Sequence, residues 1–247
     1  MTFFILGNIW EIMRKEMPLE KRIILALDVP SGEEAKRWVS RLKQFIKFYK
    51  IGLELFISEG RDIVNWVLDQ GCDVMLDLKL FDIPNTVQRA IERIRDMKVS
   101  YTTVHGNDGI LRAAVEAKGD LKVLAVTVLT SLDESDLRDL GFRCDVRELV
   151  ISRAKRALEI GCDGVVASGL ELQAIRENLG EKLIVVVPGV RPVSNTTIDD
   201  QKRIITPKEA FLRGADHIVM GRPILNSENP EKVVENLLIE ISEVVGK

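Results

Sequence analysis

Short apolar runs alternate with amphipathic stretches along almost the whole chain. The apolar runs are rich in Val, Ile and Leu and are bounded by Gly, Pro, Asp or Ser, which is typical of buried β-strands. The stretches between them place apolar residues at helical spacing. We predict eight strands, at 23–29, the front of 48–56, 72–80, 101–106, 122–131, 163–169, 182–190 and 216–222.

Helices are predicted in the intervals between these strands. Ser31 precedes Glu33 and Glu34, which is a typical helix start, and Gly71 closes the second helical stretch. The predicted helices lie at 31–45, 58–71, 85–98, 109–118, 133–160 in two pieces, 170–179, 207–213 and 229–245.

Eight strand–helix units predict a closed (β/α)₈ barrel, the TIM-barrel fold. Several strands are apolar throughout, as expected when both faces of a sheet are buried. A span of about 225 residues suits such a barrel, and a doubly wound open sheet is the alternative. No linker or low-complexity segment interrupts residues 21–247, so we predict one domain there. Residues 191–203 form a long connection without periodicity, and such loops are often functional.

Residues 1–20 are predicted to be an extension outside the barrel. The apolar start, MTFFILGNIW, is interrupted by Gly7 and Asn8 and is shorter than the ~20 apolar residues that span a bilayer. Arg14 and Lys15 follow the apolar run, whereas a signal peptide carries its positive charge in front. The extension is therefore interpreted as an amphipathic cap or as the product of an early start codon.

Composition narrows the range of partners. The chain is 46% hydrophobic and has a formal net charge of −3, so no global basic field attracts nucleic acid or an anionic membrane. We predict neither as a partner. Cys72, Cys144 and Cys162 are too widely spaced for a disulfide framework or a C-x-x-C motif. Reduced cysteines predict a cytoplasmic protein.

Charged residues gather at the ends of the first three predicted strands. Asp28 ends the first strand, Lys50 lies on the second, Asp77 and Lys79 lie on the third, and Asp82 follows it. In such barrels the active site lies at the carboxyl ends of the strands. Because Asp77 and Lys79 are two positions apart, their side chains should share one side of the strand. We predict a cluster of alternating charges at the barrel mouth, with ordinary ion pairs that close the barrel as the alternative.

The later strands end in residues suited to phosphate. Gly189 lies at the end of the seventh strand, and Gly221 and Arg222 end the eighth, where barrels often bind phosphate. In the alternative interpretation, Gly221 only ends a strand and Arg222 is a surface charge. His105 ends the fourth strand and either lines the site or is structural, and His217 is predicted to be structural. No residues have metal-ligand spacing, so no metal site is predicted.

Several specific segments run in order from about residue 22 to residue 240. They are LDV at 27–29, YKIG at 49–52, DLKLFDIPNTV at 77–87, TVHGNDG at 103–109, VTVLTS at 126–131, VPGVRP at 187–192, and Gln201 followed by GRPI at 221–224. The most specific is the D-x-K-x-x-D-I-P-N-T block. In these segments the chain resembles the orotidine 5′-phosphate decarboxylase family.

The resemblance implies a homodimeric (β/α)₈ barrel that converts orotidine 5′-phosphate to UMP without a metal or cofactor, in de novo pyrimidine synthesis. It assigns proton donation to Lys79, in a charge array with Lys50 and Asp77. It implies that Asp82 and Thr86 reach the site from the partner subunit. The implied substrate-binding residues are Asp28, Lys50, Asp77, Asp82, Ile83, Pro84, Thr86, Thr130, Ser131, Pro188, Arg191, Gln201, Gly221 and Arg222.

Two other functions remain open at the level of sequence. A sugar-phosphate lyase of the same barrel superfamily would share the D-x-K-x-x-D array but would use Mg²⁺ and an enediolate intermediate. The I-P-N-T continuation, V-P-G-V-R-P and Gln201 favour the decarboxylase. A non-catalytic nucleotide-binding protein is the other alternative, and the intact Asp77, Lys79 and Asp82 argue against it.

Overall fold

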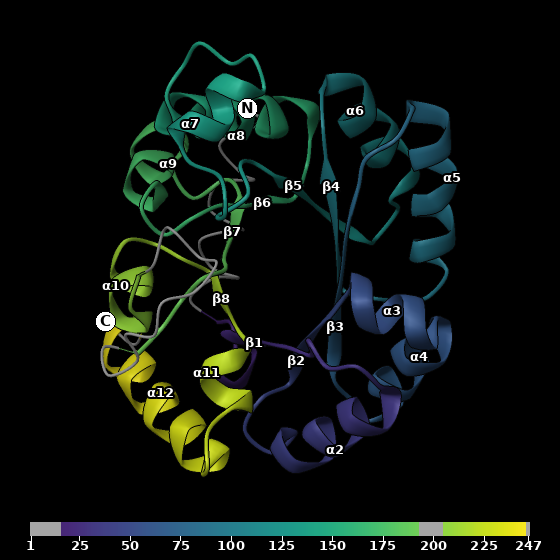
Figure 1. Cartoon of the computed structure of the whole chain (residues 1–247), viewed down its shortest axis with the longest axis vertical. Coiled ribbons are helices and arrows are strands. Elements are labelled where there is room, and N and C mark those ends of the chain that lie inside the picture. The colour runs from purple at the N-terminus through teal and green to yellow at the C-terminus, as the bar shows by residue number, and fades with distance from the viewer. Residues whose placement is uncertain (1–15, 193–204, 246–247) are drawn as a thin grey trace.

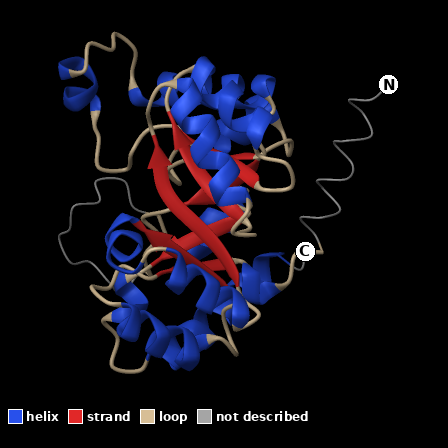
Figure 2. Cartoon of the chain, turned by 90° about the vertical axis from the view of Figure 1, so that its right-hand side faces the viewer, coloured by secondary structure: helices blue, strands red, loops and turns tan. Residues whose placement is uncertain are grey.

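The computed structural model describes residues 16–192 and 205–245. Within these residues eight parallel strands follow one another in chain order around a closed barrel, and β8 pairs with β1 to close it. The strands form an inner ring with the helices outside (Figure 1). The view turned by 90° also shows helices enclosing the strands (Figure 2). The predicted (β/α)₈ barrel is confirmed, and the doubly wound open sheet is excluded.

The strands match the predicted apolar runs but are shorter. Several predicted ends, including Thr130 and Gly169, belong to the loops that leave the barrel. The strands are β1 (Ile23–Ala26), β2 (Phe48–Gly52), β3 (Asp73–Leu80), β4 (Tyr101–His105), β5 (Lys122–Val126), β6 (Gly164–Val166), β7 (Ile184–Val187) and β8 (His217–Met220).

The helices agree with prediction except for three short elements. The 3₁₀ helix η1 (Leu19–Lys21), α3 and α11 were not predicted, and Gly52 both ends β2 and caps α3. The α-helices are α2 (Gly32–Leu42), α3 (Leu53–Glu59), α4 (Arg61–Asp69), α5 (Pro84–Arg95), α6 (Asp108–Ala117), α7 (Glu134–Asp139), α8 (Val146–Ile160), α9 (Leu172–Leu179), α10 (Pro207–Leu212), α11 (Arg222–Leu225) and α12 (Pro230–Val245).

Alternation along the strands separates two apolar clusters and positions the charged residues. On β2, Tyr49 and Ile51 pack in the larger cluster beneath the helices, whereas Phe48 packs in the smaller cluster inside the barrel. Successive side chains of a strand point to opposite faces. Lys50 therefore shares the inward face with Phe48, but it lies two residues further along, toward the mouth.

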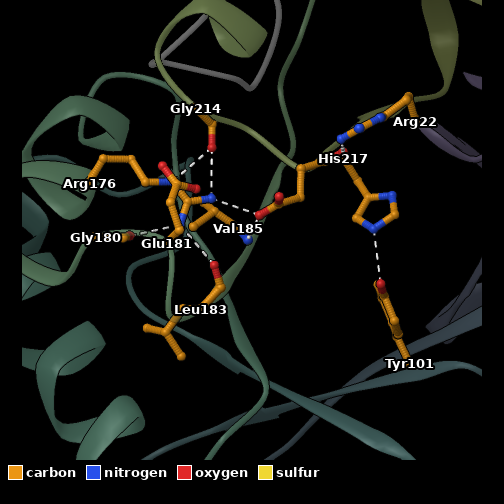
Figure 3. A network of polar contacts seen from close by, with 10 residues as sticks. Arg22, Tyr101, Arg176, Gly180, Glu181, Leu183, Val185, Gly214 and His217 are labelled. Atoms are coloured by element: carbon orange, nitrogen blue, oxygen red, sulfur yellow. Dashed lines mark hydrogen bonds and ion pairs between the residues drawn. The ribbon is translucent and has the colours of Figure 1, made fainter. Parts of the chain in front are cut away.

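A buried polar network stabilises the amino-terminal end of the barrel (Figure 3). The Arg176 guanidinium on α9 pairs with Asp216 at 2.7 Å and donates to the backbone carbonyls of Gly214 and Leu183. The Asp216 carboxylate also accepts the Val185 N–H at 2.7 Å. Both charged side chains are at most 10% exposed, so each needs the other to offset the cost of burial.

His217 lies in this network in its neutral form. Its Nδ1 is 2.8 Å from the Lys21 carbonyl oxygen, which can only accept, so Nδ1 carries the proton. Nε2 must then accept from the Tyr101 hydroxyl at 2.9 Å (Figure 3). Burial is the main reason that the pKa of His217 falls to about 4. His217 is thus structural within the described residues, as predicted.

Acid should destabilise the protein through His217. The unfolded chain takes up a proton near the ordinary pKa of 6.5, while the folded chain resists it down to about 4. The free energy of unfolding should therefore fall by up to about 3 kcal/mol as the pH drops through that interval. Urea denaturation at pH 7 and pH 4.5 measures the loss. His217→Asn keeps a donor for Lys21 and should show a smaller loss; an equal loss in both proteins would contradict the assignment.

No helix in the described part of the chain is both long enough and apolar enough to cross a membrane. Whether residues 1–20 stand apart from the barrel stays a prediction, because residues 1–15 lie outside the described residues.

Candidate active site

A cavity of about 280 Å³ opens at the carboxyl ends of the barrel strands. Its walls combine inward-facing strand residues with the loops that follow β5, β7 and β8. Most of the predicted site residues line it: Asp28, Lys50, Asp77, Lys79, Thr130, Ser131, Pro188, Arg191, Gly221 and Arg222. Apolar strand residues such as Met75, Val126 and Val219 also line the cavity and were not predicted. Strand alternation was the signal that could have identified them.

Four charged side chains form an unbroken Asp–Lys chain, Asp28–Lys50–Asp77–Lys79, along one wall of the cavity. Lys50 Nζ lies 2.9 Å from Asp28 Oδ1 and 3.8 Å from Asp77 Oδ2. Lys79 Nζ lies 2.8 Å from the same Asp77 oxygen. Gly52 leaves space for the Lys50 ammonium, because a Cβ at position 52 would lie only 3.1 Å from Lys50 Nζ. Each charge has an opposite neighbour, as predicted for the barrel mouth.

Asp77 is the buried centre of the Asp–Lys chain. Its burial alone would raise the pKa of the carboxyl group. The positive charges of Lys50 and Lys79, together with hydrogen bonds from Lys79 and Thr103, outweigh burial and hold the pKa of Asp77 below its ordinary value. Asp77 is therefore an anion at neutral pH. The Lys79 side chain is 36% exposed, against 10% for Asp77, so its ammonium reaches the open part of the cavity.

A β-bulge, not a regular strand repeat, brings Lys79 to Asp77. The pairing of β3 with β4 shifts register between Leu76 and Leu80, and Lys79 has a φ of 46°. We expected Asp77 and Lys79 to share one side of the strand because they are two positions apart. That expectation is incomplete, since the strand is irregular here. Bulges re-aim side chains and are common beside active sites. The Lys79 N–H donates to Thr103 Oγ1 at 2.9 Å, a contact that was not predicted.

The residues expected to serve a partner subunit lie away from the cavity in the single chain. Asp82 is exposed, and its Oδ1 accepts the Ile83 N–H at 2.6 Å. Ile83 and Pro84 are also exposed, and Thr86 is half-buried at the start of α5. None of these residues lines the cavity. The side chains of Phe81 and Ile83 are 68% and 67% exposed to solvent.

The segment after β7 returns to the barrel beside the cavity. Val190 forms an isolated β-bridge with Ile205, and the Arg191 N–H donates to the Ile205 carbonyl at 3.0 Å. Arg191 is buried, at 5% exposure. The predicted phosphate ligand Gln201 belongs to residues 193–204, which lie outside the described residues.

The loop after β5 brings Thr130 and Ser131 to the opposite wall. The strand itself ends at Val126, so the prediction that it continues to Ser131 is wrong. The guanidinium of Arg153 donates to the Thr127 carbonyl, which anchors the beginning of the loop. Thr130 and Ser131 therefore line the cavity from a loop, whereas Lys50 and Asp77 line it from strands.

His105 does not line the cavity. Its ring packs edge to face against the ring of Phe81, with 5.6 Å between the ring centroids. His105 also borders a neighbouring cavity of about 340 Å³. Burial, with smaller contributions from Arg153 and Lys79, lowers the pKa of His105. Its position favours the structural interpretation. Among the described residues, no group of three or more His, Cys, Asp or Glu side chains is arranged to hold a metal ion.

A family model described as "Orotidine 5'-phosphate decarboxylase / HUMPS family" matches residues 21–237. The chain belongs to this family. A protein named orotidine 5′-phosphate decarboxylase from Methylococcus capsulatus is 50% identical over 234 residues, which cover 94% of this chain and 97% of the relative. A second, of the same name from Nitrobacter winogradskyi, is 43% identical over 91% of this chain and 94% of its own length.

Solved structures of the family have the same fold. The crystal structure of orotidine 5′-phosphate decarboxylase from Lactobacillus acidophilus matches with a TM-score of 0.79 at 34% identity, covering 90% of this chain and 99% of that one. The enzyme of that name from Pyrococcus horikoshii OT3 matches with a TM-score of 0.71 at 29% identity, covering 89% and 98%. The resemblance stated from the sequence motifs is confirmed.

Proposed function

We propose that the protein is a carboxy-lyase that decarboxylates orotidine 5′-phosphate to UMP in pyrimidine biosynthesis. Membership of the family supports the reaction. The observation that carries the proposal is the Asp–Lys chain in the mouth cavity, which ends in a lysine ammonium beside a buried carboxylate.

Loss of CO₂ from the pyrimidine requires stabilisation of a carbanion. The bond between C6 and the carboxylate breaks, its electron pair stays on C6, and CO₂ leaves. A fixed ammonium stabilises that charge where it develops, which is often the largest contribution to catalysis. We assign this role to Lys79, whose Nζ then donates its proton to C6 to give UMP. Asp77 holds the Lys79 ammonium in place through their ion pair, and would lie near the departing carboxylate.

The rest of the cavity is proposed to hold the ribose and the phosphate. Asp28 and Lys50 would contact the ribose hydroxyls, and Thr130, Ser131 and Pro188 would lie near the base. The phosphate would be held by Arg191, Gln201, Gly221 and Arg222, because backbone N–H groups and guanidinium groups suit its oxygens. The phosphate is remote from C6, so contacts to it take no part in bond breaking. They can instead contribute binding energy that orients the reacting atoms.

We propose that the active form is a homodimer, with Asp82 and Thr86 contributed to the site of the neighbouring subunit. The β3–α5 loop that carries Asp82 also exposes Phe81 and Ile83, and α3 exposes Leu53 (54%) and Ile57 (80%). These side chains follow the neighbouring strands β2 and β3 at the same end of the barrel, and larger exposed apolar patches are typical of protein–protein interfaces. In the proposed dimer a second copy would cover them, and Asp82, which lies between Phe81 and Ile83, would reach the partner's cavity.

We place the activity in the cytoplasm. Cys72 and Cys162 are buried, Cys144 is half-buried, and all three are free thiols. Free cysteines in this number agree with a reducing compartment.

The direct test of the reaction is an absorbance assay of the purified protein with orotidine 5′-phosphate, with and without EDTA. We expect loss of the substrate absorbance at the same rate in both samples. Activity that disappears with EDTA and returns with Mg²⁺ would indicate the metal-dependent chemistry of a sugar-phosphate lyase. Binding of UMP without release of CO₂ from the substrate would indicate a nucleotide-binding protein without catalytic activity.

A further inference from the structure

Thr103 lies on β4, buried in the barrel wall, and contacts the Asp–Lys chain there. Its side chain is completely buried and does not line the cavity. Its single hydroxyl group contacts both reactive residues of β3: Oγ1 lies 2.9 Å from the Lys79 backbone nitrogen and 2.7 Å from Asp77 Oδ1. Thr103 therefore joins the backbone of one charged residue to the side chain of the other.

The donors and acceptors in this arrangement are fixed by chemistry. The Lys79 N–H can only donate, so Thr103 Oγ1 accepts from it. The Thr103 hydroxyl proton is then available for the carboxylate of Asp77, which accepts it. A hydrogen bond to an ionised acceptor is stronger than one between neutral groups. Rotation of the hydroxyl would break this second contact, so both contacts select one rotamer.

The hydrogen bond to Thr103 stabilises an unusual backbone conformation at Lys79. Its φ of 46° lies in the left-handed region, which residues with a Cβ rarely adopt. The ladder between β3 and β4 is interrupted between Leu76 and Leu80, so regular strand pairing does not fix this residue. The hydroxyl of Thr103 instead provides an acceptor for the Lys79 N–H at the bulge.

We propose that Thr103 is a positioning residue for the decarboxylation. It holds the bulge that aims the Lys79 ammonium and locks the Asp77 carboxylate that faces that ammonium. A displacement of about 1 Å at a reacting group can lower a rate by two orders of magnitude. Proton donation by Lys79 is itself proposed, so the role of Thr103 rests on the proposed function.

The neighbouring threonine provides a matched control. Thr102 is equally buried on β4, and its hydroxyl donates to the Leu76 carbonyl on the same strand, β3, at 3.0 Å. Because side chains alternate along a strand, Thr102 points toward the helices and Thr103 toward the barrel interior. Thr102→Val and Thr103→Val each remove one buried hydroxyl that bonds to β3, but only Thr103→Val removes contacts to the Asp–Lys chain.

The experiment compares Thr103→Val, Thr103→Ser and Thr102→Val in the full-length protein. For each variant, steady-state assays with orotidine 5′-phosphate give kcat and KM, titration gives the dissociation constant for UMP, and thermal unfolding gives the Tm. We expect Thr103→Val to lower kcat at least about tenfold, with KM and the UMP constant within about threefold of wild type. Thr103→Ser should recover most of the rate, and Thr102→Val should keep it despite a comparable change in Tm.

Two results would overturn the role of Thr103. One is a Thr103→Val kcat within threefold of the Thr102→Val value, and the other is a Thr103→Ser rate as low as that of Thr103→Val. If Thr103→Val does not fold, Thr103→Ala is judged by the same comparison, because it places no methyl group against Asp77. A wild-type protein without decarboxylase activity, or a fully active Lys79→Ala variant, would instead overturn the proposed function.

Discussion

Replacing Lys79 with alanine should lower kcat for orotidine 5′-phosphate by at least about 10²–10³-fold, the loss expected when one fixed electrostatic donor is removed. The ammonium is 2.8 Å from Asp77 and lines the cavity, so in the proposed mechanism its removal would deprive the developing carbanion of its ammonium neighbour and its proton donor. The measurement is the steady-state rate of the purified variant, with thermal unfolding to establish that it is folded.

Lys98 is the matched control for this substitution. Among the described non-glycine residues, Lys79 and Lys98 have positive φ values, 46° and 63°. Lys98 is exposed in the turn between α5 and the amino-terminal end of β4, and it does not line the cavity. Lys98→Ala therefore reproduces the loss of a lysine at a left-handed position and should leave kcat unchanged. A Lys79→Ala variant as active as Lys98→Ala would remove Lys79 from the mechanism.

Two inactive variants should restore activity to each other if the site is shared between subunits. In a mixed dimer of Lys79→Ala and Asp82→Asn chains, one site carries both substitutions and the other carries neither. Random exchange of subunits makes half of the dimers mixed, and one of the two sites in each mixed dimer is intact. We therefore expect about a quarter of all sites in the mixture to be active. Refolding the two variants together and assaying the mixture measures this recovery, which should far exceed the activity of either variant alone.

Asp77 supplies the control for subunit exchange. Asp77 and Lys79 lie on the same strand and form an ion pair within one chain. A mixture of Lys79→Ala and Asp77→Asn chains should therefore stay inactive, because every site contains one of the two substitutions. Recovery in that mixture, or its absence in the mixture with Asp82→Asn, would contradict the proposed contribution of Asp82 across the interface.

The periodic pattern of the sequence was sufficient to predict the barrel and the charges at its mouth. Strands such as Ile184–Val187 are apolar at every position because both of their faces are buried, and this pattern is local in sequence. Asp28, Lys50 and Asp77 could be assigned to one cluster because consecutive parallel strands end at the same side of a barrel.

The finer geometry of the site could not be predicted, because it depends on contacts between strands. The bulge at Lys79 is defined by its register against β4, and the local sequence DLKL reads as an ordinary strand. Thr103 belongs to the quoted TVHG segment, but its contact with Lys79 spans 24 residues. The helix α3 was missed because Leu53–Glu59 follows strand β2 directly, without a capping side chain to mark its start.

The two polar systems lie at opposite ends of the barrel, and this has a consequence for how stability and activity depend on sequence. The Arg176–Asp216 pair secures the amino-terminal end, while the Asp–Lys chain occupies the carboxyl end. Substitutions at well-separated sites usually have additive effects. Substitutions around His217 that change the stability of the protein to heat or acid should therefore leave the proposed reaction at Lys79 largely unaffected.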